Sequence, residues 1–104
     1  MKEVIDYVFW FNGTFFEFIS NNIEYNVATL KAINSIFKSR LEKNKMPVLI
    51  KDVLIYMGYD GSNGYTEQMY RYGWSKPEEL SIEILRSENR DQLLVVLENV
   101  KKIF

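Results

Sequence analysis

The chain has 104 residues with 13 basic and 14 acidic side chains, a length that fits one domain, and 47% of its residues are hydrophobic. Cysteine and histidine are both missing, which excludes disulfides, the usual zinc sites and catalytic pairs that need a thiol or an imidazole. The net charge is −1 and the charges are evenly spread, so the whole chain offers little electrostatic attraction for nucleic acid.

The apolar segment at residues 4–19 is compatible with two structures. Asn12 and Gly13 lie between two aromatic runs, and this dipeptide is typical of a tight hairpin turn because both residues tolerate positive φ. The pattern slightly favours a hairpin in which Phe9 faces Phe16. A helix is the alternative, because five apolar side chains fall on one helical stripe: Val4, Val8, Phe11, Phe15 and Phe18.

No membrane span is predicted in this segment. Asp6, Asn12 and Glu17 interrupt it, and it contains no run of about 18 apolar residues. A secretory signal peptide would need a basic start and a small-residue cleavage site, and neither is present. We therefore expect a cytoplasmic protein.

The clearest element is a helix over residues 25–43. Asn21 or Asn22 can cap its start, and Asn44 followed by Pro47 predicts its end. Its apolar residues follow helical spacing: Val27, Leu30, Ile33, Phe37 and Leu41.

Lys31, Lys38 and Lys45 lie seven residues apart on the other side of this helix. Residues 28–51 carry six basic side chains and one acidic side chain, Glu42. Such a face can contact phosphates, although a solvated helix face is the commoner explanation. Nucleic-acid binding through these lysines is therefore an alternative function.

After Pro47 the pattern predicts a short extended piece, a short helix over residues 51–57, and a helix stop at Gly58. Residues 60–64 are loop in composition, and residues 66–72 predict one further helical turn. The loop resembles the start of a calcium-binding loop. That pattern fails, because Tyr65 and Arg71 occupy the two positions that need glycine and glutamate.

Residues 76–104 allow strands or helices. Ser75 to Glu78 fits a capping box. Alternating residues at 80–85 and an apolar run at 93–98 favour an antiparallel strand pair. The alternative for the second segment is a helix with one apolar face: Leu93, Leu97, Val100 and Phe104.

Three carboxylates in this region, Glu78, Glu79 and Glu83, could in principle pair for acid–base catalysis or hold Mg²⁺. Glu78 and Glu79 are better explained as charges of a first helical turn or loop. Glu83 fits the solvent-facing position of an alternating strand. We therefore expect no enzyme activity, no metal and no cofactor.

Six aromatic side chains and four glycines crowd residues 56–74. Tyrosine, tryptophan and arginine are enriched where proteins bind one another, and exposed rings can also stack on bases or sugars. The competing explanation is that these rings cap the core. The predicted partner-binding residues are Tyr59, Tyr65, Tyr70, Arg71, Tyr72 and Trp74.

The order of elements resembles small proteins encoded by phages of Gram-positive bacteria. The resemblance runs from Phe16 to Phe104 and rests on an extended step into a short helix, a glycine stop and a later Gly-Trp. Lys51 stands where those proteins often have asparagine, and Met57 where they often have leucine before the glycine. The resemblance implies an α+β domain of viral or prophage origin and carries over no catalytic residue.

These observations predict one globular α+β domain over residues 1–104, with one long helix and short helices packed on a small antiparallel sheet. We expect a non-enzymatic accessory protein, such as an inhibitor, that binds a host or phage protein through residues 59–74. One alternative is a structural virion or assembly component that self-associates. The other is the nucleic-acid-binding protein considered above.

Overall fold

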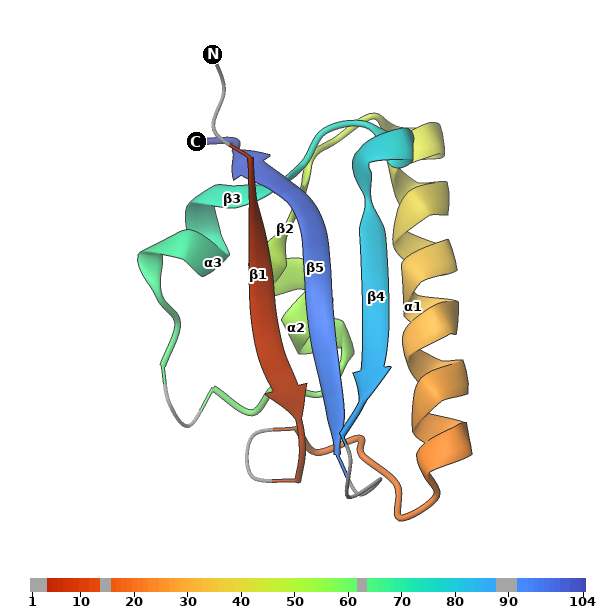
Figure 1. Ribbon diagram of the computed structural model, residues 1–104. Helices are drawn as coiled ribbons and strands as arrows, with labels where there is room; N and C mark the ends of the chain where they lie inside the picture. The colour runs from red at the N-terminus through yellow and green to blue at the C-terminus, as the bar shows by residue number, and fades with distance from the viewer. Residues whose placement is uncertain (1–3, 14–15, 62–63, 88–91) are drawn as a thin grey trace.

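The computed structural model describes residues 4–13, 16–61, 64–87 and 92–104. It has the predicted α+β architecture, with one long helix, short helices and a five-stranded antiparallel sheet (Figure 1). The elements in chain order are β1 (Val4–Phe11), α1 (Ile23–Asn44), β2 (Val48–Leu49), α2 (Ile50–Tyr56), α3 (Glu67–Arg71), β3 (Tyr72–Trp74), the 3-10 turn η1 (Pro77–Glu79), β4 (Ser81–Arg86) and β5 (Leu93–Lys102).

Strand β5 is the centre of the sheet. β1 pairs along one side of it, from Phe11 opposite Leu93 to Val4 opposite Lys101. Along the other side β5 pairs first with β4 and then with β3, which in turn pairs with β2. β5 therefore links the two ends of the chain, because its partners come from both the first and the last third of the sequence.

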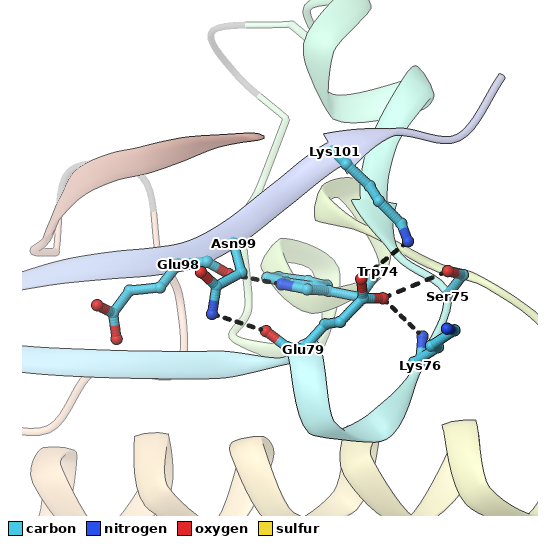
Figure 2. Close-up of polar contacts among 7 residues, drawn as sticks. All are labelled: Trp74, Ser75, Lys76, Glu79, Glu98, Asn99 and Lys101. Carbon is cyan, nitrogen blue, oxygen red and sulfur yellow. Dashed lines mark hydrogen bonds and ion pairs between the residues drawn. The ribbon is translucent and has the colours of Figure 1, made fainter. Parts of the chain in front are cut away.

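The change of partner on β5 occurs around Asn99. Ser81 of β4 pairs with Glu98, whereas Gly73 of β3 pairs with Lys101. Asn99 has a φ of 61°, a left-handed conformation that asparagine tolerates better than most residues. Figure 2 shows that side chains here hydrogen-bond two backbone carbonyls, one of Glu98 in β5 and one of Glu79 in η1.

Trp74 fills the space beside this irregularity. Its side chain is fully buried, and its indole N–H donates to the Glu98 carbonyl at 2.7 Å. The Asn99 amide donates to the Glu79 carbonyl at 3.2 Å. A buried indole needs such a partner, because an unpaired N–H in the core costs about 1–3 kcal/mol.

A partly buried ion pair lies beside Trp74. The Lys101 ammonium is 2.9 Å from the Glu79 carboxylate, and Lys101 is 8% exposed. Burial alone would raise the pKa of Glu79, but hydrogen bonds and charge from Lys101, with hydrogen bonds from Lys76 and Ser75, lower it overall. Figure 2 shows these donors converging on one carboxylate.

The predicted long helix is confirmed as α1. The Asn22 side chain accepts a hydrogen bond from the Tyr25 N–H at 3.1 Å, so Asn22 is the cap. Lys45 follows the helix in a left-handed conformation. The predicted apolar stripe faces the core, and its first member, Val27, is half-buried against the core. The fully buried apolar residues of α1 are Leu30, Ile33, Phe37 and Leu41.

The interpretation of the N-terminal segment needs correction. Residues 4–11 are a strand that pairs with β5, so the helical alternative is wrong, and residues 14 and 15 of the predicted hairpin lie outside the described residues. Phe16 instead forms an isolated bridge with Tyr59. Phe9 and Phe16 still meet as stacked rings. The pairing of β1 with β5 joins segments from opposite ends of the chain, whereas the preference of Asn-Gly for a tight turn acts only among neighbouring residues.

The antiparallel strand pair near the C-terminus is confirmed as β4 and β5, and the helical alternative for the last segment is wrong. The capping prediction was wrong by one residue. The carboxylate that accepts from the Ser75 hydroxyl and the Lys76 N–H belongs to Glu79, and Glu78 is exposed. Glu79 lies in the first turn of η1, as predicted, and it is also the partner of buried Lys101.

The middle of the chain follows the predicted order. An extended β2 precedes helix α2, and Gly58 stops it with a φ of 92°. Predicted loop residues 62 and 63 lie outside the described residues. Gly73 allows β2 and β3 to approach, because a Cβ there would lie 1.9 Å from the Val48 carbonyl oxygen.

The sheet has one covered and one open face. Helices α1, α2 and α3 supply buried side chains to the core on one face, and Figure 1 shows no helix in front of β1, β5 and β4. The open face carries Trp10, Leu94 and Leu85 in one row across three strands, and Val8, Val96 and Glu83 in the next. Trp10 and Leu85 are each 44% exposed.

Candidate functional site

Six aromatic rings form an unbroken series of contacts from β1 to α3, which we call the aromatic row. Successive ring centroids are 6.0, 5.4, 5.6, 5.5 and 5.8 Å apart. Aromatic pairs at these separations attract one another through their ring quadrupoles as well as by burial. In order, the members of the aromatic row are Tyr7, Phe9, Phe16, Tyr59, Tyr65 and Tyr70.

Strand alternation and one bridge bring the first four rings together. Tyr7 and Phe9 are two residues apart on β1, so they point to the same face of the sheet. Phe16 approaches Phe9 through its bridge to Tyr59 and through a 2.8 Å hydrogen bond from the Glu17 N–H to the Gly58 carbonyl. The end of α2 is thereby held against the segment that follows β1.

The last two rings are placed by the glycine-rich loop. The Tyr59 hydroxyl donates to the Gly64 carbonyl at 2.7 Å. A Cβ on Gly61 would come within 3.3 Å of the Tyr65 ring. Gly61 and Gly64 both have positive φ, at 73° and 76°, which glycine adopts without strain. The loop therefore folds back and lays Tyr65 between Tyr59 and Tyr70.

A pocket of about 230 Å³ lies between β1 and the segment carrying Tyr59. Leu54 and Met69, both buried, belong to the core cluster and line it. Its remaining walls come from β1, the turn after it and the start of the aromatic loop: Tyr7, Phe9, Trp10, Asn12, Phe16 and Tyr59.

The described residues that line the pocket carry no carboxylate, ammonium or guanidinium group. Burial, together with the neighbouring Tyr59, raises the pKa of the Tyr7 hydroxyl above 10.0. Burial also raises the pKa of Tyr59, with added repulsion from Asp60 and Tyr65. Both phenols are therefore uncharged at neutral pH, and the site is suited to neutral apolar groups.

One cation lies at the far end of the aromatic row. The Lys51 ammonium is 5.1 Å from the centre of the Tyr70 ring, within the range of a cation–π contact. Tyr70 is 46% exposed and Tyr65 is 38% exposed. This end of the row is thus a surface, whereas its β1 end borders the pocket.

The structure brings three of the six predicted partner-binding residues into the aromatic row: Tyr59, Tyr65 and Tyr70. Arg71 is exposed and forms a 3.2 Å ion pair with Glu67 one turn away on α3. Tyr72 is half-buried on β3. Trp74 is fully buried against β5, as the competing core explanation predicted, so it offers no contact surface.

Sequence reasoning missed the contribution of β1 to the site. Tyr7, Phe9 and Trp10 line the pocket, although the prediction placed all contact residues between 59 and 74. Exposed and half-buried residues alternate along β1 in the structure, but the sequence does not show this alternation because every residue of the strand except Asp6 is apolar or aromatic. Only the pairing of β1 with β5 places that alternation beside Tyr59.

The lysines of the nucleic-acid alternative remain at the surface. Lys31 and Lys45 are exposed and Lys38 is half-buried. Lys45 leaves the helical path in a left-handed conformation, so the three do not continue as one helical stripe. Arg40, the cation nearest to rings on this helix, lies 4.9 Å from the Phe37 ring centre and 5.5 Å from that of Tyr56.

Within the described residues, no group of three or more acidic side chains is placed to hold a metal ion. Glu83 is exposed on β4, as expected for the outward position of that strand. A search of the described helices finds none with the length and apolar character needed to cross a membrane.

Comparisons with known proteins gave no match: no family model fits the chain, and neither a curated protein nor a solved structure is similar to it.

Proposed function

We propose that this chain is a non-catalytic binding protein whose aromatic row contacts another protein. The observation that carries the proposal is a continuous set of rings that ends in exposed Tyr65 and Tyr70. Tyrosine offers a large, rigid contact area at low cost in conformational entropy. Rings that already pack against one another lose little further freedom when a partner covers them.

The chemistry of the pocket supports binding over catalysis. Its lining residues supply aromatic and aliphatic surface, one amide and two neutral phenols. General acid–base catalysis near neutral pH needs a group that titrates there, and the raised pKa values of Tyr7 and Tyr59 move those phenols away from that range. If the chain is phage-encoded, as its resemblance to phage proteins implies, the bound protein belongs to the host or to the phage.

Affinity capture with a matched pair of variants tests this function. Tagged wild type, a Tyr65→Ser/Tyr70→Ser double variant and a Leu85→Ser control are exposed to a lysate of the source cells. Leu85 has similar exposure but lies on the open face of the sheet. We expect a stoichiometric protein that wild type and control retain and the double variant loses. Equal retention by all three proteins would contradict the assignment to the aromatic row.

A second candidate is self-association through the open face of the sheet. Val8 and Trp10 of β1 and Leu85 of β4 are exposed there, next to partly buried Leu94 and Val96. Contiguous apolar surface of this kind often marks an interface. Sedimentation equilibrium tests it: a defined oligomer that Trp10→Ser converts to monomer supports this candidate, and a monomer at millimolar concentration removes it.

A further inference from the structure

Strand β1 forms an edge of the sheet. Its only strand partner among the described residues is β5. Backbone hydrogen bonds outside the regular elements, so far as they involve described residues, join none of residues 4–11 to another segment. An edge strand presents a row of N–H and C=O groups on its free side. Eight residues are long enough for a second strand to pair along it.

The pocket opens beside this edge. Tyr7 and Phe9 belong to β1 and also line the pocket, while Leu54, Tyr59 and Met69 form the opposite wall. A strand added to β1 would send alternate side chains toward this pocket, because successive side chains of a strand point to opposite faces. An apolar cavity of about 150 Å³ is enough to hold benzene. The pocket, at about 230 Å³, has room for one large side chain.

We propose that β1 binds an extended peptide segment of the partner protein as an added strand, with one large apolar side chain of that segment seated between Tyr7, Phe9, Leu54, Tyr59 and Met69. The inference rests on the proposed function and states its mode of recognition. In such strand addition, main-chain hydrogen bonds supply affinity and a pocket for alternate side chains supplies specificity.

Charge complementarity specifies the peptide further. Among the described residues the pocket lining is uncharged, so an aromatic or large aliphatic side chain fits it and a charged one would find no charged partner there. Asp6 is the charged residue of β1 and it is exposed on the opposite face of the strand. Opposite charges across neighbouring strands are favourable. The expected segment therefore alternates an apolar residue toward the pocket with a basic residue beside Asp6.

A single strand fits this edge better than a second copy of the chain. Figure 1 shows α3 and the segment before it extending beyond β1 at the free edge of the sheet. In two copies paired through β1, each copy would bring this projection against the other at the shared edge. A single extended peptide carries no such projection, so it can lie along β1 and reach the pocket.

A random-peptide display selection, followed by binding of the selected synthetic peptide to labelled protein, tests the proposal. We expect enriched sequences in which an aromatic or large aliphatic residue lies one or three positions from a basic one, because residues an odd number apart point to opposite faces of a strand. Hydrogen exchange followed by NMR should then show alternate amides of β1 becoming protected in the complex, with β4 unchanged. Protection confined to the β4 edge, or peptides that bind without protecting β1, would overturn the proposal.

Two variants that fill the pocket provide the matched test. Leu54→Phe and Met69→Phe add volume at the pocket wall. We expect each to weaken binding of the selected peptide at least about tenfold, which is about 1.4 kcal/mol. Leu85→Phe adds a ring on the open face and should leave the affinity within about twofold. Because overpacking can disturb a core, circular dichroism first establishes which filling variant is folded. Unchanged affinity in a folded filling variant contradicts the pocket assignment.

The outcomes separate this inference from the proposed function. If no peptide is enriched but the Tyr65→Ser/Tyr70→Ser variant still loses a captured protein, strand addition is wrong and the binding function stands. If β1 amides become protected at high protein concentration without peptide, the occupant is a second copy and the inference is wrong. If neither peptide nor captured protein is found, both proposals fail.

Discussion

Trp74 and Tyr65 come from the same tyrosine-rich segment but have opposite surroundings. Trp74 is fully buried and its indole donates to the Glu98 carbonyl, beside the Glu79–Lys101 ion pair. We call the region formed by Trp74, Glu79, Glu98 and Lys101 the sealed region. Tyr65 is 38% exposed and contacts its neighbours Tyr59 and Tyr70 through ring edges and tilted faces.

The difference teaches that composition alone does not separate a core ring from a contact ring. Trp74 is on β3, where the change of partner along β5 leaves room for an indole and provides a carbonyl for its N–H. Tyr65 follows a loop whose glycines lay it on other rings at the surface. The sealed region serves stability, and we propose that the aromatic row serves binding.

The largest expected effect is the loss of Trp74. Trp74→Ala should lower the free energy of unfolding by about 3–5 kcal/mol, because it removes a fully buried ring and leaves a cavity. Urea unfolding followed by far-UV circular dichroism measures this. Trp10→Ala is the control of the same residue type on the open face, and it should cost less than about 1 kcal/mol. Similar losses in both variants would contradict the contrast between the two regions.

Removing the buried cation should have the next largest effect. Lys101→Met leaves the Glu79 carboxylate without its ammonium partner at 2.9 Å. Breaking a fully buried pair costs about 3–5 kcal/mol, and we expect less here because the Glu79 side chain is 28% exposed. Lys102→Met changes the exposed neighbour and should stay within about 0.5 kcal/mol of wild type in the same urea titration. An unchanged free energy of unfolding in Lys101→Met would show that the ion pair is dispensable for stability.

The ion pair also predicts a pH dependence. The pKa of Glu79 is lowered in the folded state from 4.5, so its contribution to stability is present above pH 4.5 and is lost as pH falls through the folded value. Urea titrations at several pH values below 5 should show wild type losing more stability than Glu79→Gln, which cannot titrate. If the stability of the two proteins fell equally with decreasing pH, Glu79 would be excluded as the source of this pH dependence.

The smallest effect on stability is expected in the aromatic row. Tyr65→Ala should lower the free energy of unfolding by less than about 1 kcal/mol, because the ring is partly exposed and loses only its contacts with Tyr59 and Tyr70. The same change should weaken partner binding by about 2 kcal/mol or more if Tyr65 is an anchor of the interface. Calorimetry with the captured partner measures the second quantity, and unchanged affinity would place the anchor elsewhere.

Local patterns in the sequence were sufficient for several elements. The spacing from Leu30 to Leu41 predicted α1, because a helix must bury one stripe. Alternation in β4 and the apolar run in β5 predicted their antiparallel pair. The left-handed glycine stop after α2 also followed from local geometry, since Gly58 adopts a positive φ without strain.

The sequence by itself also determined that the chain has no cysteine or histidine chemistry and that its tyrosines cluster. Only the tertiary structure decided that β1 pairs with β5, from the opposite end of the chain, and that Trp74 is sealed while Tyr65 is open. The physical reason is that strand partners and burial are set by packing between residues far apart in sequence, whereas periodicity and turn preferences act among neighbours.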